Sequence, residues 1–224
     1  MAEIEKKILV LIPAFNEAER ITDVIQKART YLPVLVVDDG SQDNTSEIAR
    51  TNGAIVIRQT PNQGKGAAMA NGFQYALEQG YDAVITLDAD GQHDPAELPL
   101  FEKEFVKNGS DLIIGQRDFR KMPFVRMCSN TVGTWMFSWA IGQPIPDNQS
   151  GYRLISARLM NSMLSSKQHG FEFEVEMVLR CVLEGCKLSW VPIRTIYAGE
   201  HSHIKPIRHA WRFILLTSRT LRSS

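Results

Sequence analysis

This sequence of 224 residues has little cysteine and no net charge. Its three cysteines are odd in number and form no C-x-x-C pair, so we expect reduced thiols rather than a disulfide framework. The 25 basic and 25 acidic side chains cancel, which removes any global electrostatic argument for binding nucleic acid. Any basic surface is therefore local, and we expect no nucleic-acid partner.

Long apolar runs are also missing. No strongly apolar stretch reaches the about 18 residues that suggest a transmembrane helix, and the N-terminus lacks the basic and apolar regions of a secretion signal. The nearest approach is the uncharged segment 127–146, which contains Trp135, Phe137 and Trp139 among Ser, Asn, Thr and Gly residues. We expect this segment to be either a buried helix or a helix that touches lipid.

Runs rich in β-branched residues alternate with helical stretches through the first half of the chain. ILVLIP, VLVVD, AIVI, AVIT and DLII are typical of strands that are buried on both faces. Between them, Asn16, Asn44 and Asp94 have the pattern of helix N-termini, and Gly53 and Gly109 stand where helix C-caps belong. Strand–helix–strand repetition predicts an α/β fold with a mainly parallel sheet flanked by helices.

The pattern changes after about residue 120. Helical stretches are expected at roughly 125–142, 156–166 and 172–184, with strands in 147–156 and 187–197. We expect this half to cover the sheet and to form the second wall of a cleft.

Polar side chains follow the predicted strands at their C-terminal ends. Parallel α/β sheets bind ligands beyond those ends, so these groups predict a site rather than scattered surface charge. They are Pro13, Asn16, Glu17, Asp38, Asp39, Gly40, Ser41, Asp88, Asp90, Gln92, Gln116 and Arg117.

The stretch VITLDADGQHDP, residues 84–95, places Asp88 and Asp90 at the end of a predicted strand. A calcium loop would need Gly at its sixth position and Glu at its twelfth, and both are absent. A phosphatase with an Asp nucleophile usually carries such a motif on its first strand, whereas here it follows the fourth.

Carboxylate and amide oxygens suit Mg²⁺ or Mn²⁺ on a nucleotide diphosphate. A solvated turn that caps the next helix accounts for Asp94 but not for two adjacent carboxylates, which repel unless a cation neutralises them. His93 is open to either packing or a supporting role.

The glycine-rich segment NQGKGAAMANG, residues 62–72, has two interpretations. Free amides of Gly64 and Gly66 could cradle a phosphate, with Lys65 adding positive charge. The segment matches neither a P-loop nor a dinucleotide-binding fingerprint, so taken alone it indicates a turn before a helix.

Six motifs occur together and in order: IPAFNE, VVDDGSQDNT, NQGKGAA, LDADGQHDP, IIGQR and QSGYRLIS. The set resembles family 2 glycosyltransferases of the Rossmann-like GT-A fold, in the subgroup of dolichol-phosphate mannose synthase and other polyprenyl-phosphate sugar transferases. The resemblance covers about residues 6–205. It implies a catalytic domain over 1–200, followed by a basic amphipathic helix over 201–224.

The resemblance also implies roles on the donor side, toward a nucleotide-diphosphate sugar of the GDP-mannose or UDP-glucose type. The base, ribose and diphosphate would be met by Pro13, Asn16, Glu17, Asp39, Lys65 and Asp88. The divalent cation, Mg²⁺ or Mn²⁺, would be bound by Asp88, Asp90 and Gln92. Arg153 and Lys205 would lie near the diphosphate or the acceptor. The closing loop departs from the subgroup, since GEHSHIKP stands in place of GESK.

On the acceptor side, the resemblance places Arg117 and Arg126 at the phosphate of a polyprenyl or dolichyl phosphate. The reaction would be an inverting displacement at the anomeric carbon. A hydroxyl acceptor is the alternative and would need a carboxylate base, for which Asp147 is the best candidate; Glu172, Glu174 and Glu176 are less clear. A non-enzymatic sugar-nucleotide-binding module is a further alternative. The Q-x-x-R-W signature of processive synthases is absent, which disfavours polymerisation.

A lipid acceptor implies contact with a membrane. Residues 201–224 contain five Lys or Arg and no acid, and on a helix Trp211 would share a face with Ile207 and Ile214. This pattern is typical of an interfacial helix on anionic lipid, or of a terminal helix that packs on its own domain or on a partner subunit. We therefore expect a peripheral protein on the cytoplasmic face of the membrane.

Overall fold

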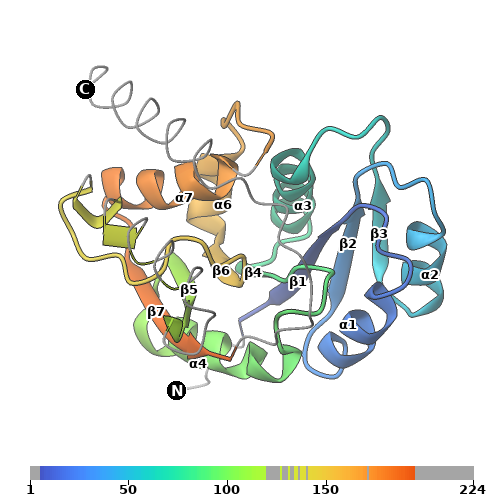
Figure 1. Ribbon diagram of the computed structural model, residues 1–224, viewed down its shortest axis with the longest axis horizontal. Helices are drawn as coiled ribbons and strands as arrows, with labels where there is room; N and C mark the ends of the chain where they lie inside the picture. The colour runs from blue at the N-terminus through green and yellow to red at the C-terminus, as the bar shows by residue number, and fades with distance from the viewer. Residues whose placement is uncertain are drawn as a thin grey trace.

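The computed structural model describes residues 6–119, 127, 131, 134–135, 137–139, 141–170 and 172–194. Within these residues one seven-stranded sheet has the order β3-β2-β1-β4-β6-β5-β7 (Figure 1). The strands are β1 (Ile8–Ala14), β2 (Val34–Asp38), β3 (Ile55–Arg58), β4 (Ala83–Thr86), β5 (Leu112–Arg117), β6 (Arg153–Ser156) and β7 (Leu188–Ile193). The helices are α1 (Ile21–Ala28), α2 (Thr45–Thr51), α3 (Lys65–Glu78), the 3₁₀ turn η1 (Pro95–Glu97), α4 (Leu98–Asn108), α6 (Ala157–Met163) and α7 (Glu172–Leu183).

Six of these strands are parallel, and β6 runs antiparallel to both of its neighbours, β4 and β5. The predicted α/β fold with a mainly parallel sheet is confirmed. Because β6 runs the other way, the loop that enters it, 147–152, lies at the C-terminal ends of β4 and β5. This reversal brings the second half of the chain to the predicted polar edge.

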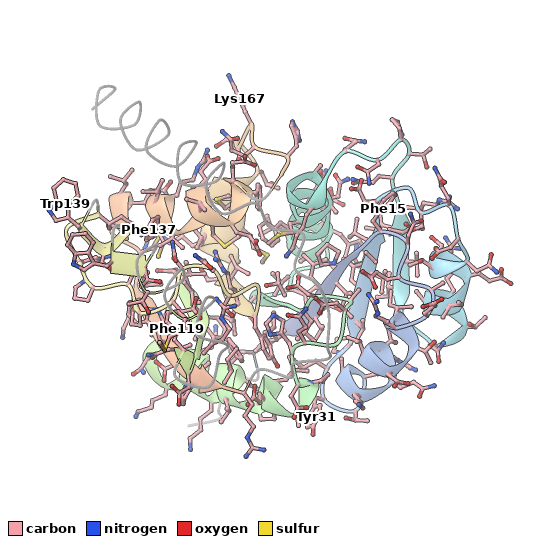
Figure 2. The ribbon with its side chains drawn as sticks, viewed as in Figure 1. Phe15, Tyr31, Phe119, Phe137, Trp139 and Lys167 are labelled. Carbon is pink, nitrogen blue, oxygen red and sulfur yellow. The ribbon has the colours of Figure 1, made fainter. Side chains whose placement is uncertain are left out.

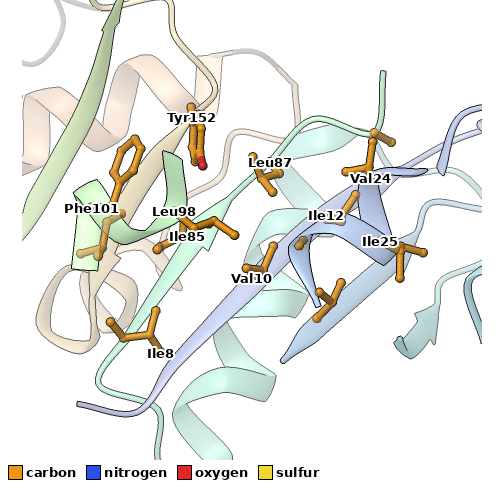
Figure 3. Packing of buried hydrophobic residues seen from close by; sticks show 14 of the residues in the cluster. Ile8, Val10, Ile12, Val24, Ile25, Ile85, Leu87, Leu98, Phe101 and Tyr152 are labelled. Carbon is orange, nitrogen blue, oxygen red and sulfur yellow. The ribbon is translucent and has the colours of Figure 1, made fainter. Parts of the chain in front are cut away.

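One face of the sheet is covered by α1 and α4 (Figure 1). Val10 and Ile12 of β1 point to this face and belong to one buried cluster with Ile25 of α1 and Phe101 of α4 (Figure 3). Tyr152 closes the same cluster, with its ring stacked on Phe101 at 4.4 Å between centroids. The cluster thus reaches from the centre of the sheet to the loop that precedes β6.

The opposite face is covered by α3, α6 and α7 (Figure 1). Leu9 and Leu11, the alternate residues of β1, point to this side and pack with Phe73 of α3 and Phe173 of α7. Burial on both faces explains why β1 reads as a continuous apolar run rather than an alternating one.

The predicted helix boundaries agree with the structure in part. The Asp94 side chain accepts a hydrogen bond from the Ala96 backbone N–H and caps η1, and Gly109 ends α4 in the left-handed conformation. Asn44 directly precedes α2, although its side chain makes no capping bond. The prediction that a helix begins at Asn16 is wrong, because α1 begins at Ile21.

The second half is more irregular than the sequence suggests. The expected helices at 156–166 and 172–184 correspond to α6 and α7, but of the segment 147–156 only the last four residues form a strand. The described residues between 127 and 141 are helical, as expected for 125–142. None of the helices in the described residues is long and apolar enough to cross a membrane. The basic helix expected over 201–224 lies outside the described residues.

Candidate functional site

The loops that follow β1 and β2 are joined by hydrogen bonds at the C-terminal edge of the sheet. The Asn16 N–H donates to Ser41 Oγ at 2.8 Å, and Asn16 Oδ1 accepts from the Gln42 N–H at 2.8 Å. The Glu17 N–H donates to Thr45 Oγ1 at 2.9 Å. Asn16 has φ 56°, a left-handed conformation that asparagine tolerates better than most residues. Asn16 therefore shapes this edge instead of starting a helix, and it brings Glu17 beside the loop that follows β2.

Asp39 is buried behind the glycine-rich turn. Its Oδ2 accepts from the Gly64 N–H at 2.8 Å, and its Oδ1 accepts from the Gln63 N–H at 2.7 Å and from the Gln59 side-chain amide. Both oxygens of Asp39 are thus engaged in holding the turn that begins α3. This turn leads directly into Lys65, the first residue of α3.

Asp88 lies between two nitrogen-bearing side chains. Lys65 Nζ is 2.6 Å from Asp88 Oδ1, and His93 Nε2 is 3.4 Å from Asp88 Oδ2. Desolvation by burial opposes ionisation, but the Lys65 charge and the His93 contact outweigh it and hold the pKa of Asp88 below its usual range. The same pairing raises the pKa of Lys65 above its ordinary value, against the effect of burial. Asp88 is therefore a carboxylate that keeps its negative charge.

Asp90 has a different environment from Asp88. Its Oδ1 accepts a hydrogen bond from the Gln92 N–H at 2.9 Å. Burial, together with the nearby negative charge of Asp88, raises the pKa of Asp90. Two carboxylates that disfavour each other's charge are stabilised when a cation arrives between them.

These residues fit a hard divalent cation. Two carboxylates, Asp88 and Asp90, would leave positions for an amide, phosphate or water oxygen. Among the described residues no three His, Cys, Asp or Glu side chains form a ready-made metal cluster. Mg²⁺ and Mn²⁺ favour such mixed oxygen sets. Gly151 leaves the space that the Asp88 carboxylate occupies, because a Cβ at this position would stand 2.6 Å from Asp88 Oδ2.

Arg117 and Asp147 form a bidentate ion pair across the ends of β5 and the loop before β6. Arg117 Nε lies 2.7 Å from Asp147 Oδ2 and Arg117 NH2 lies 2.9 Å from Asp147 Oδ1. Asp147 is fully buried, and its Oδ1 also accepts from the Gln149 N–H. A general base must reach the proton that it removes, whereas this carboxylate is directed at Arg117. In this structure Asp147 orients Arg117.

Arg153, expected near the diphosphate or the acceptor, is buried among backbone carbonyls. Its guanidinium donates to the oxygens of Ser150 at 2.8 Å, Asn148 at 2.9 Å and Glu174 at 2.6 Å. Arg153 therefore holds the loop before β6 against α7. Arg126 and Lys205, two further predicted site residues, lie outside the described residues.

His93 and Glu174 also belong to the site, and the sequence alone assigns neither of them a role. His93 is buried, and its ring packs on Tyr152 with centroids 5.1 Å apart, so it combines packing with contact to Asp88. Glu174 of α7 is also buried, and its Oε1 lies 3.2 Å from Lys65 Nζ. The only signal in the sequence for Glu174 is the alternation of Phe and Glu in FEFEVEM, which does not reveal which acid turns inward.

A cavity of about 940 Å³ opens beyond the ends of β5 and β7. It borders Arg117 and Asp94 and combines charged with apolar walls. The lining residues are Asp94, Ala96, Glu97, Leu100, Gln116, Arg117, Asp118, Phe119, Pro146, Pro192, Ile193 and Arg194.

Comparison with known proteins identifies the family. The family model described as glycosyl transferase family 2 matches residues 9–162. An undecaprenyl-phosphate mannosyltransferase of Micrococcus luteus is 34% identical over 207 residues, covering 84% of this chain and 82% of that protein. A polyprenol monophosphomannose synthase of Mycolicibacterium smegmatis is 31% identical over 206 residues, covering 84% of this chain and 77% of the other.

Solved structures show the same fold at lower identity. Glucosyl-3-phosphoglycerate synthase of Mycobacterium tuberculosis, crystallised with Mg²⁺ and uridine diphosphate, superimposes with a TM-score of 0.77 at 18% identity. The match covers 96% of this chain and 80% of that one. The fold is thus GT-A. The chain belongs to glycosyl transferase family 2 and is a glycosyltransferase related to the polyprenyl-phosphate mannosyltransferases.

Proposed function

We propose that the protein transfers a hexose from a nucleotide-diphosphate sugar, of the GDP-mannose or UDP-glucose type, to a polyprenyl phosphate. The observation that carries this proposal is the meeting of Lys65, Asp88 and Asp90 at one edge of the sheet, with Arg117 beside a cavity at the same edge. The relatives named for undecaprenyl-phosphate and polyprenol substrates support the choice of acceptor.

On the donor side, Asp88, Asp90 and Gln92 would bind Mg²⁺ or Mn²⁺. Such a cation supplies Lewis-acid stabilisation of the departing nucleoside diphosphate. Lys65 adds a positive charge at the same end of the site, where its Nζ lies 2.6 Å from Asp88 Oδ1. The nucleoside would occupy the edge formed after β1 and β2, near Pro13, Asn16, Glu17 and Asp39.

On the acceptor side, a lipid phosphate is already an anion and needs positioning more than it needs a base. Arg117, held by Asp147, is suited to that task because guanidinium groups bind phosphate oxygens in a fixed geometry. The engagement of Asp147 favours a phosphate acceptor over a hydroxyl, which would require a free carboxylate. Direct attack by the phosphate oxygen in a single displacement would invert the anomeric linkage. Arg126 and Lys205 remain proposed contacts of the acceptor and the diphosphate.

We also propose that the protein meets the membrane through the helical residues of 127–141. Trp135 and Trp139 are 69% and 81% exposed and stand four residues apart, on one side of a helix. Phe137 between them is buried, and Figure 2 shows Trp139 projecting from the edge of the molecule. Thr134 contacts Asn148, next to Asp147, so this helix adjoins the proposed acceptor side. The basic segment 201–224 would strengthen contact with anionic lipid on the cytoplasmic face.

Donor turnover with defined metals tests the proposal. Release of nucleoside diphosphate from GDP-mannose and UDP-glucose is measured with Mn²⁺, with Mg²⁺ and with EDTA. We expect turnover only with metal and a loss of at least about 100-fold in Asp90→Ala. Asp82→Asn is the matched control, since Asp82 precedes the opposite end of β4 and pairs with Lys6. Activity that survives in EDTA would count against the proposal.

A further inference from the structure

Glu174 has a contact that the proposed reaction does not yet use. It lies on α7, about a hundred residues after Lys65 in the sequence, yet its Oε1 is 3.2 Å from Lys65 Nζ. The same ammonium is 2.6 Å from Asp88 Oδ1. Lys65 therefore contacts two carboxylates: Asp88 of the proposed metal site and the buried Glu174.

The first turn of α3 packs closely against α7 and the segment that precedes α7. The Gly66 N–H donates to His169 O at 2.8 Å, and a Cβ on Gly66 would stand only 2.8 Å from Phe173 Cβ. The Glu174 backbone oxygen is fixed by Arg153, as described above. Glu174 thus approaches Lys65 from a helix that is packed against the start of α3.

A buried carboxylate is costly unless a cation accompanies it. Asp88 Oδ1 cannot keep the Lys65 ammonium at 2.6 Å and also bind a divalent cation without strong repulsion between the two positive charges. Lys65 then needs another carboxylate within reach, and Glu174 is 3.2 Å away.

We propose that Glu174 is a positioning residue of the donor site, which keeps the Lys65 ammonium in place when Asp88 binds a cation. The lysine then stays at the diphosphate end of the site instead of turning to solvent. This inference rests on the proposed donor site.

The first test follows the reactivity of Lys65 without any sugar nucleotide. Intact protein is acetylated at one fixed pH with and without Mn²⁺, and the rate at Lys65 is measured by mass spectrometry relative to exposed Lys27 and Lys107. We expect wild-type Lys65 to remain protected in both conditions. In Glu174→Gln we expect protection without Mn²⁺ and acetylation at least about tenfold faster with it.

Two further variants control this test. Glu176→Gln changes an acid on the same helix that pairs with Arg180, so Lys65 should stay protected. Glu174→Asp retains a carboxylate and should restore most of the protection, which also covers the case in which Glu174→Gln does not fold. Equal acetylation of Lys65 in wild type and Glu174→Gln with Mn²⁺ would overturn the inference.

The second test is a double-mutant cycle on nucleotide binding. Affinities for UDP and GDP are measured by calorimetry with Mn²⁺ for Glu174→Gln, Lys65→Met and the combined variant. If Glu174 acts through Lys65, Glu174→Gln alone weakens nucleotide binding by about tenfold. The same change has no further effect when it is added to Lys65→Met. Additive losses would show a merely structural role and overturn the inference. Failure of both nucleotides to bind wild type would instead refute the proposed donor, and the acetylation result would still decide the role of Glu174.

Discussion

Gly151 shows how one absent side chain shapes the site. A Cβ there would stand 2.6 Å from Asp88 Oδ2 and 3.3 Å from Oδ1, so the carboxylate occupies the space that an alanine would fill. We predict that Gly151→Ala displaces Asp88 and weakens Mn²⁺-dependent binding of nucleoside diphosphate at least about tenfold, at a stability cost of about 1–3 kcal/mol. Calorimetry and denaturant unfolding measure the two effects.

Gly142→Ala is the matched control for this variant. Gly142 has φ 75° and open space around it, so alanine there strains the backbone and costs about 1 kcal/mol without touching Asp88. A Gly151→Ala protein that binds metal and nucleotide as well as Gly142→Ala would contradict the assigned position of Asp88.

Glu97 gives a pH dependence whose sign follows from its burial. Its Oε1 accepts from the Arg194 N–H at 2.8 Å, while its Oε2 is buried without a hydrogen-bond partner in the described structure. Burial raises the pKa of Glu97 above the ordinary 4.5, so the folded state holds the proton more tightly than the unfolded chain. The stabilisation is complete below pH 4.5 and is lost as pH rises through the raised pKa.

Glu97→Gln tests that dependence, because an amide oxygen can still accept from Arg194 while no charge forms. We expect the free energy of unfolding to fall less steeply with rising pH in the variant than in wild type. Denaturant titrations from about pH 4.5 to 7 measure it, and parallel slopes would show that Glu97 does not titrate abnormally.

At the scale of elements, the packing of α3 on α7 opposes helix propensity at Gly66. Propensity alone predicts that Gly66→Ala stabilises α3 by about 1 kcal/mol. The new Cβ, however, would meet Phe173 Cβ at 2.8 Å and Gln168 O at 2.9 Å. We therefore predict net destabilisation of about 1–3 kcal/mol by denaturant unfolding. A more stable variant would show that the two elements are less closely packed than described.

Elements were predictable where a local pattern fixes them. The strands buried on both faces are continuous apolar runs, and Asp94 before Pro95 indicates a helix start. The four residues of β6 carry no signal for strand direction, and the loop 147–152 reads as strand until its contacts with Arg117 and Arg153 are known. The helix start predicted at Asn16 is wrong because the Asn16 side chain accepts a hydrogen bond from Gln42, 26 residues away.

Site residues were also predictable only where a local sequence pattern marks them. Asp88 and Asp90 were predictable because they adjoin a strand end in the sequence. The partners of Lys65, Arg117 and Arg153 were not, because they come from segments that only the fold brings together. Sequence patterns report neighbours along the chain, whereas a buried carboxylate is paired through space.

At the scale of the whole molecule, the proposed membrane contact is tested at the exposed tryptophans. We expect the double variant Trp135→Ala/Trp139→Ala to bind vesicles of phosphatidylcholine and phosphatidylglycerol at least about tenfold more weakly, because aromatic rings anchor at the membrane interface. Tyr31→Ala is the control, since Tyr31 is also exposed and lies on another side of the molecule (Figure 2). Equal sedimentation of both proteins with vesicles would remove these tryptophans from the contact.

A transfer assay tests whether the acceptor is a polyprenyl phosphate. Labelled GDP-mannose and UDP-glucose are offered with Mn²⁺ and with undecaprenyl phosphate or undecaprenol, and label is counted in the organic phase. We predict transfer to the phosphate alone and a loss of at least about 100-fold in Arg117→Ala, because the phosphate is an anion that needs positioning and no base. Transfer to undecaprenol at a comparable rate, or transfer to the phosphate that is unaffected by Arg117→Ala, would contradict the account.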